Sequence, residues 1–159
     1  GEIGEIYLLP PGGQGSTYHY IGAESEALEG GWESLGDMGY VDAEGYIYLS
    51  DRKTDMILAG GANIYPAEIE AAIDTHPLVR SSAVIGLPDD DLGQSVHAIV
   101  DAAETLTDAA LLQHLTEHLA RYKIPRTVEI VQTPLRDDAG KTRRSALLKA
   151  RLAQTKPTD

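Results

Sequence analysis

Short apolar runs alternate with turns rich in glycine and proline along most of the chain. The runs contain many Ile, Val and Tyr residues, and their brevity is typical of β-strands rather than helices. Residues 42–45, which end in a glycine, separate two of the runs by the length of a hairpin turn. We therefore expect strands at 5–9, 40–41, 46–49, 56–59, 83–87, 96–100 and 127–131.

Three segments instead carry apolar residues at intervals of three and four, which places them on one face of an α-helix. The first begins at Pro66, which suits the first helical position, and ends before His76-Pro77. The second follows Thr107, a residue type that caps helix N-termini, and the third covers residues 142–153. The leucines expected to face inward are Leu111, Leu112, Leu115 and Leu119 in the second helix, and Leu147, Leu148 and Leu152 in the third.

A charged segment, Asp51 to Asp55, stands between two of the expected strands. Burying it without partners would be costly, so we expect an exposed joint there. The net charge of −12 is also unevenly distributed, because residues 1–51 contain ten acids and no Lys or Arg, whereas residues 52–159 contain fifteen acids and thirteen bases. Such asymmetry often marks a domain boundary. We expect an α+β chain in two parts, residues 1–51 and 52–159.

Composition narrows the class of protein further. An apolar share of 42% is enough for a packed core, and the absence of Cys excludes disulfides, thiolate metal sites and Cys nucleophiles. It also suits a reducing compartment, so we expect a cytoplasmic protein. The acidity argues against non-specific nucleic-acid binding, and no apolar run is long enough to span a membrane. The first residues lack an initiator Met and resemble mid-chain sequence, which favours a fragment.

Two glycine-flanked positions are candidates for ligand binding. Asp37 lies between Gly36 and Gly39, where an Asp usually caps its own turn. A carboxylate in such a place can also accept hydrogen bonds from both hydroxyls of a ribose. The pair Gly60-Gly61 follows an expected strand and has no side chains to obstruct a ligand, although a simple turn would look the same.

Lys141 is the candidate for chemistry at a phosphate. It follows Gly140 in a polar loop, so its amine can reach outward. Solvation is the usual fate of a Lys, but a reaching ammonium group is also a good point charge for phosphoryl oxygens. Asp137 and Asp138 would tend to keep it protonated. Seven of the thirteen basic residues lie from Arg136 onward, and most of them are expected on the solvated face of the last helix.

The segment His114-Leu115-Thr116-Glu117-His118 matches an inverted zinc-protease pattern. Its two histidines lie one helical turn apart, but no third ligand is identifiable. Solvated histidines beside the leucine stripe explain the pattern as well, and chance matches to so short a motif are frequent. We therefore assign no metal site.

Taken together, three segments resemble the adenylate-forming enzymes, the family of acyl-CoA synthetases, luciferases and the adenylation domains of peptide synthetases. The resemblance implies that residues 1–51 end a large, β-rich N-terminal domain. It implies that residues 52–159 form the small, mobile C-terminal domain, a short-stranded sheet with helices packed on it. The segments are Gly36-Asp37 with Gly39-Tyr40 and Gly45-Tyr46; Asp51-Arg52 through Gly60-Gly61 to Pro66-Ala67-Glu68-Ile69-Glu70; and Gly140-Lys141.

The resemblance also implies roles for individual residues. Asp37 would hold the ribose hydroxyls of ATP or AMP, and Arg52 would be its cationic companion beside the nucleotide. Thr54 occupies the hinge about which the small domain swings, where the family commonly has Asp or Lys. Gly60-Gly61 would line the channel for coenzyme A. Lys141 would be the catalytic lysine that bridges the carboxylate substrate and the α-phosphate.

The implied activity is the AMP-forming ligation of a carboxylic acid to coenzyme A (CoA). It requires ATP with Mg²⁺, whose ligands lie outside this chain, and the missing N-terminal domain, without which the chain should be inactive. Self-association is a possible outcome for residues 1–51, which would lack most of their native neighbours. The alternatives are an adenylation domain that loads a carrier protein, and a non-catalytic α+β binding module.

Overall fold

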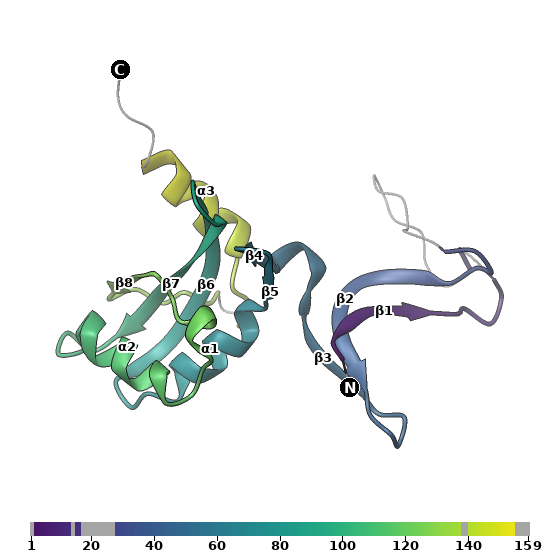
Figure 1. Ribbon diagram of the computed structural model, residues 1–159, viewed down its shortest axis with the longest axis horizontal. Coiled ribbons are helices and arrows are strands. Elements are labelled where there is room, and N and C mark those ends of the chain that lie inside the picture. The colour runs from purple at the N-terminus through teal and green to yellow at the C-terminus, as the bar shows by residue number, and fades with distance from the viewer. Residues whose placement is uncertain (1, 14, 17–27, 138–139, 155–159) are drawn as a thin grey trace. The chain divides into compact units, whose positions relative to one another are not determined.

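A computed structural model describes residues 2–13, 15–16, 28–137 and 140–154. It divides the chain into two compact units (Figure 1). Unit 1 is Gly1–Thr54 and unit 2 is Asp55–Asp159. The sequence predicts this division three residues earlier, after residue 51. Among the described residues, no helix has the length and apolar content that crossing a bilayer requires.

Unit 1 contains a three-stranded antiparallel sheet in the order β1-β2-β3, formed by β1 (Gly4–Leu8), β2 (Glu33–Val41) and β3 (Ile47–Arg52). The expected hairpin is present, with Tyr40 opposite Tyr48 and their rings stacked 4.9 Å apart. The Asp42 carboxylate closes the turn by accepting the backbone N–H groups of Glu44 and Tyr46 at 3.0 and 2.9 Å. This is a common use of Asp in turns.

Gly39 marks an irregularity in the pairing of β2 with β3. The register shifts between Met38 and Gly39, which is the signature of a β-bulge. A β-carbon on Gly39 would overlap the backbone carbonyl of Tyr48, so only glycine fits. The bulge lies two residues after Asp37 on the same strand.

Unit 2 is built on a five-stranded sheet. Its strands are β4 (Ile57–Ala59), β5 (Ala62–Ile64), β6 (Val79–Asp89), β7 (Gly93–Ala102) and β8 (Thr127–Val131), in the order β5-β4-β7-β6, with β8 also paired to β7. All pairs are antiparallel except β7 with β8. The sequence pattern does not predict β5, because three residues are too few to show a periodic pattern.

Helices α1 (Pro66–Asp74) and α2 (Asp108–Thr116) pack side by side on one face of this sheet (Figure 1). Thr107 caps α2 as expected, accepting the backbone N–H of Ala110 at 3.2 Å. Every second residue of β7 faces these helices, and burying each large aliphatic side chain contributes about 1.5–3 kcal/mol. The buried cluster comprises Ile57, Ile64, Ile69, Ala72, Ile73, Val84, Val96, Ala98, Val100, Ala102, Leu106, Leu111 and Leu115.

Helix α3 (Arg144–Gln154) differs from the other two, because none of its described residues is buried. The expectation that Leu152 faces inward is wrong, since this residue is 36% exposed, while Leu147 and Leu148 are only half-buried. Two arginines attach α3 to the unit instead, as described below. The overall fold is nevertheless the expected α+β arrangement of a sheet with helices packed on it.

Candidate functional site

Asp37 and Arg52 are neighbours across strands β2 and β3. They are direct partners in the register, and Arg52 Nε lies 3.7 Å from Asp37 Oδ1. The side chains are 26% exposed for Asp37 and 72% exposed for Arg52. An ion pair this open contributes little to stability. Both groups can therefore turn toward a ligand at small cost, so the geometry suits the binding of a polar, charged molecule.

A polar brace lies beside this pair in unit 1. The Ser34 hydroxyl donates to Glu5 Oε1 and accepts the backbone N–H of Gly36 at 2.9 Å. Lys53 Nζ lies 2.8 Å from Glu5 Oε2. Burial opposes ionisation of Glu5, but the hydrogen bonds from Lys53 and Ser34 outweigh it and lower the pKa of this carboxyl group. The brace ties β1 to the part of β2 just before Asp37 and to the residue after β3.

Thr54 lies in a 3₁₀ turn, Lys53–Asp55, that follows β3 directly. It is exposed and is the last residue of unit 1. A short exposed turn between two compact units has few contacts to break when its backbone angles change. The described surroundings of Thr54 are therefore compatible with a hinge.

Gly60 and Gly61 form the tip of the hairpin that joins β4 to β5. Both have positive φ angles, +57° and +81°, which side-chain-bearing residues rarely adopt. The Gly60 N–H donates to the Leu92 carbonyl at 2.9 Å, so this tip lies against the turn between β6 and β7. A β-carbon on Gly61 would meet nothing within 4 Å, and the tip leaves space for a thin ligand.

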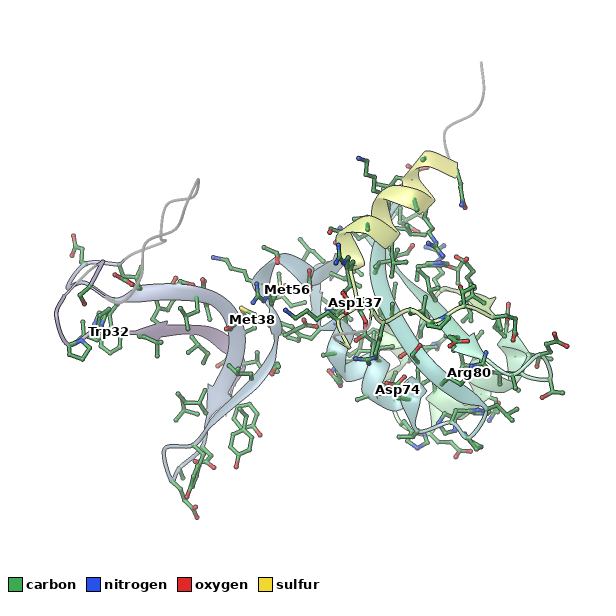
Figure 2. The ribbon with its side chains drawn as sticks, turned by 180° about the vertical axis from the view of Figure 1, so that it is seen from behind. Trp32, Met38, Met56, Asp74, Arg80 and Asp137 are labelled. Atoms are coloured by element: carbon green, nitrogen blue, oxygen red, sulfur yellow. The ribbon has the colours of Figure 1, made fainter. Side chains whose placement is uncertain are left out.

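Lys141 lies opposite Asp137, while residues 138 and 139 lie outside the described residues; we call residues 136, 137 and 140–142 the Lys141 hairpin. Arg136 pairs with Thr142 across this Lys141 hairpin. Inside it, Asp137 (labelled in Figure 2) accepts the Lys141 backbone N–H on its carboxylate at 2.9 Å and donates its own N–H to the Lys141 carbonyl at 3.0 Å. The backbone at Lys141 is thus held, while the residue is exposed. The expected contribution of Asp138 falls outside the described residues.

Arg144 is a residue whose role the sequence pattern missed. Its guanidinium group donates to Glu70 Oε1 and Oε2 at 3.1 and 2.7 Å and to Asp55 Oδ2 at 2.9 Å. The Glu70 side chain is only 9% exposed, and its carboxylate also accepts the backbone N–H of Val84 at 2.8 Å. We call these ion pairs the Arg144 clamp. Arg144 is therefore an exception to the expectation that most of the basic residues in this region are solvated.

Arg151 forms a second clamp two helical turns further along α3. It donates through Nε and Nη2 to the two carboxylate oxygens of Glu129 on β8, at 3.0 and 2.8 Å. These bonds lower the pKa of the Glu129 carboxyl group, although burial opposes the effect. Arg151 is a second exception to that expectation. Local sequence carries no signal for either clamp, because Glu70 and Glu129 are remote in the chain.

The histidines of the zinc-like pattern have other partners. His114 Nε2 lies 2.8 Å from the Thr75 hydroxyl, and His118 Nδ1 donates to the His114 carbonyl at 2.9 Å. Across residues 2–13, 15–16, 28–137 and 140–154, no group of three or more His, Asp or Glu is arranged to hold a metal ion. The described geometry gives the zinc hypothesis no support.

Comparison with known proteins shows the family of the chain. Residues 68–141 match the family model of the AMP-binding enzyme C-terminal domain. The chain belongs to the adenylate-forming enzymes. The resemblance inferred from the sequence is therefore confirmed, and the matched region runs from the start of α1 to Lys141.

Curated relatives of this adenylate-forming chain are CoA ligases. The 2-succinylbenzoate–CoA ligase of Bacillus cereus is 40% identical over 123 residues, which are 77% of this chain and 26% of that enzyme. The ligase of the same name from Bacillus mycoides is 36% identical over 146 residues, 92% of this chain and 30% of the enzyme. The chain thus spans less than a third of the length of these relatives.

Solved adenylate-forming enzymes share the fold. The o-succinylbenzoate CoA synthetase of Bacillus subtilis, in complex with its acyl-adenylate intermediate, matches with a TM-score of 0.79 at 35% identity over 92% of this chain and 30% of its own. That enzyme has also been solved with ATP and a magnesium ion. The fatty acyl CoA synthetase of Mycobacterium tuberculosis matches with a TM-score of 0.67 at 40% identity, over 80% of this chain and 26% of its own.

Proposed function

We propose that this chain is the C-terminal part of an AMP-forming acyl-CoA synthetase. The complete enzyme activates a carboxylic acid with ATP to acyl-AMP and pyrophosphate, and then transfers the acyl group to CoA. The observation that carries the proposal is the 40% identity to a CoA ligase over 77% of the chain. Residues 1–54 would belong to the N-terminal domain and residues 55–159 to the mobile C-terminal domain.

In the first half-reaction, a carboxylate oxygen of the substrate attacks the α-phosphorus of ATP. The bond from that phosphorus to the bridging oxygen breaks, and pyrophosphate leaves with the electron pair. Lys141 places a positive charge where the carboxylate and α-phosphate oxygens meet. Such a donor is worth about a hundredfold in rate or more. Its exposed position on a hairpin whose backbone is held supports this role.

Asp37 and Arg52 are the proposed nucleotide-binding residues of this chain. The Asp37 carboxylate accepts hydrogen bonds from the two ribose hydroxyls, and Arg52 is the cation beside the nucleotide. Their adjacent positions, with Arg52 exposed and Asp37 partly exposed, support the assignment. We expect the Mg²⁺ that accompanies ATP to take its ligands from outside this chain.

The second half-reaction uses the other face of unit 2. Rotation about Thr54 withdraws Lys141 and brings Gly60-Gly61 to the line along which CoA enters. The CoA thiolate attacks the acyl carbonyl carbon, the bond from that carbon to the AMP oxygen breaks, and AMP leaves. The division of the chain between Thr54 and Asp55 supports a pivot at this point.

The apolar surface of unit 1 supports the participation of a further domain. The described residues of unit 1 leave many large apolar side chains exposed, and an apolar surface of this kind marks an interaction site. We assign this surface to the N-terminal domain of the complete enzyme, so the chain alone is inactive. Self-association stays a prediction. The exposed residues are Ile3, Leu8, Leu9, Leu28, Trp32, Val41, Tyr46, Ile47, Tyr48 and Leu49.

The test is pyrophosphate exchange by the full-length protein with 2-succinylbenzoate, the acid named for the relatives, and with a panel of aryl and fatty acids. We expect Lys141→Ala to reduce exchange at least about a hundredfold, because the charge at the reacting oxygens is lost. Thioester formation from supplied acyl-AMP should stay largely intact, because Lys141 is withdrawn in that step.

Lys149→Ala is the matched control, since Lys149 is also an exposed Lys of the same region. Equal loss of both half-reactions in Lys141→Ala, or an equal effect of the control, would contradict the role of Lys141. Absence of exchange with every acid would favour the non-catalytic binding module. Acyl transfer to a carrier protein in preference to CoA would favour the carrier-loading alternative.

A further inference from the structure

The Arg144 clamp joins three segments of unit 2 that lie far apart in sequence. Arg144 is the first residue of α3 and comes three residues after Lys141. Its partner Glu70 lies 74 residues away on α1, and its partner Asp55 lies 89 residues away, directly after Thr54. A single guanidinium group therefore connects the segment that carries Lys141 to the first residue beyond the hinge.

The clamp is anchored on a buried group rather than on the surface. Both Glu70 oxygens are held by Arg144, and Oε1 also accepts the Val84 N–H from β6, an edge strand of the sheet. Arg144 itself is only 19% exposed. A bidentate pair between guanidinium and carboxylate fixes direction as well as distance. The orientation of α3 at its first residue is thus defined by the core of unit 2.

We propose that Arg144 is a positioning residue for Lys141. This inference rests on the proposed function of Lys141 in adenylation. The Arg144 clamp holds the Lys141 hairpin at a defined distance from the hinge, so that rotation about Thr54 delivers the ammonium group to one place. Without the clamp the lysine remains present and charged, but its position relative to the pivot varies from molecule to molecule.

Other contacts of the Lys141 hairpin do not perform this task. Arg143 Nε lies 3.5 Å from Asp137 Oδ2. This contact joins the hairpin only to the residue that directly follows it. Arg136 Nη2 lies 3.6 Å from Asp74 at the end of α1, a longer and more exposed pair. The Arg144 contacts are the shorter and better buried ones, and they alone among these three reach a residue adjacent to Thr54.

Arg151 supplies the matched control, because it also forms a bidentate pair from α3 to a glutamate of unit 2. It lies seven residues further from Lys141 than Arg144 does, and its partner Glu129 is on β8. Replacing either arginine by Lys keeps the charge but loses the planar pair of donors. A role in attaching α3 predicts equal effects for Arg144→Lys and Arg151→Lys, whereas a role in positioning Lys141 predicts unequal ones.

The kinetic experiment measures both half-reactions in the full-length protein. We expect Arg144→Lys to lower kcat for adenylation about ten- to hundredfold with little change in KM for ATP, because a displaced catalytic group loses rate rather than substrate binding. Thioester formation from supplied acyl-AMP and both rates of Arg151→Lys should stay within about twofold of wild type. Asp55→Asn, which removes only the arm next to the hinge, should give a smaller loss in the same direction.

A second experiment tests the positioning directly in the 159-residue chain. The chain contains no Cys, so Lys141→Cys with Ala71→Cys on the exposed side of α1 provides a unique pair of spin-label sites. We expect the distance distribution between the labels to broaden on adding Arg144→Lys and to remain narrow on adding Arg151→Lys. Circular dichroism would confirm that each variant is folded, and Asp55→Asn replaces Arg144→Lys if the latter is not.

The outcomes separate this inference from the proposed function. A full-length protein that performs no adenylation, together with a broadened distribution in Arg144→Lys, overturns the proposed function and leaves the bracing of the hairpin supported. An unchanged distribution, or equal kinetic losses in Arg144→Lys and Arg151→Lys, overturns the inference. An active wild type whose Arg144→Lys variant loses both half-reactions equally also overturns it.

Discussion

The two units of the chain bury their apolar residues very differently. In unit 2, large aliphatic side chains from β4, β5, α1, β6, β7 and α2 are fully enclosed. In unit 1, the buried side chains include the polar Glu33 and Ser34, whereas Leu49 is 67% exposed. Unit 2 therefore has the interior of an independent domain, and unit 1 has the surface of a piece that relies on contact with another. Apolar runs in the sequence therefore correspond to buried side chains in unit 2 and to exposed ones in unit 1.

Truncation of a leucine should have its largest effect in unit 2. Leu115 is fully buried against the core, so Leu115→Ala should lower the free energy of unfolding of unit 2 by about 2–5 kcal/mol. Leu49→Ala in unit 1 should change stability by less than about 0.5 kcal/mol, because the side chain is already in solvent. Urea unfolding followed by far-UV circular dichroism, with Trp32 fluorescence as a probe of unit 1, measures both.

Comparable effects of the two substitutions would remove the distinction between the units. A large effect of Leu49→Ala that requires high protein concentration would point instead to contact between copies through unit 1. Unfolding monitored at several protein concentrations distinguishes these results.

Gly39 in unit 1 should be sensitive to substitution, because the backbone is crowded there although the surface of the unit is open. Gly39→Ala should destabilise the β2–β3 pairing by about 1–3 kcal/mol, because the new methyl group overlaps the Tyr48 carbonyl. Gly4→Ala on β1 is the control, since a β-carbon there meets nothing within 4 Å. Hydrogen exchange of the strand amides is the measurement, and equal protection in the two variants would show that the bulge at Gly39 tolerates a side chain.

The units should also respond to acid in different pH ranges. Burial lowers the pKa of His97 in unit 2 from its ordinary value of 6.5, although the neighbouring Glu129 opposes the shift. The unfolded chain then binds more protons than the folded one as pH falls below about 6.5. The stability that this neutral histidine contributes is complete above that pH, and it is lost as pH falls toward the folded pKa.

In unit 1 the corresponding group is Glu5, whose pKa is lowered by its bonds to Lys53 and Ser34 in spite of burial. The stability that ionised Glu5 contributes is complete above the ordinary pKa of 4.5 and is lost only below it.

We expect the urea concentration at the unfolding midpoint of unit 2 to decrease when the pH is lowered from 7.5 to 5.5. His97→Gln should reduce that decrease. A midpoint that is flat over this range in the wild type would contradict the assignment to His97.

Elements with a strong local signal were predictable from the sequence. The hairpin at 40–49 followed from apolar runs around an acidic turn, and the helix starts at Pro66 and Thr107 followed from the preferences of helix N-termini. The segments on which the family resemblance depends were visible for the same reason. Glycines and charged residues in fixed order are a local pattern, which needs no knowledge of tertiary contacts.

Features that depend on tertiary contacts were not predictable. Strand β5 has three residues, too few for a periodic pattern, and it exists because Ile57 and Ile64 pair across the β4–β5 hairpin. Leucine spacing in α3 predicted a buried face, but the helix is attached by Arg144 and Arg151, whose partners are remote in the chain. The roles of Asp37, Arg52, Thr54, Gly60, Gly61 and Lys141 remain predictions for the experiments above.

The attachment of α3 through guanidinium groups has a thermodynamic consequence. Release of a helix in which no described residue is fully buried exposes little apolar area, so it adds little to the heat capacity of unfolding and little to the denaturant dependence. Ionic strength acts on it more strongly, because added salt screens charges that are partly open to water. Calorimetry would thus overlook the detachment of α3, whereas a salt titration would register it.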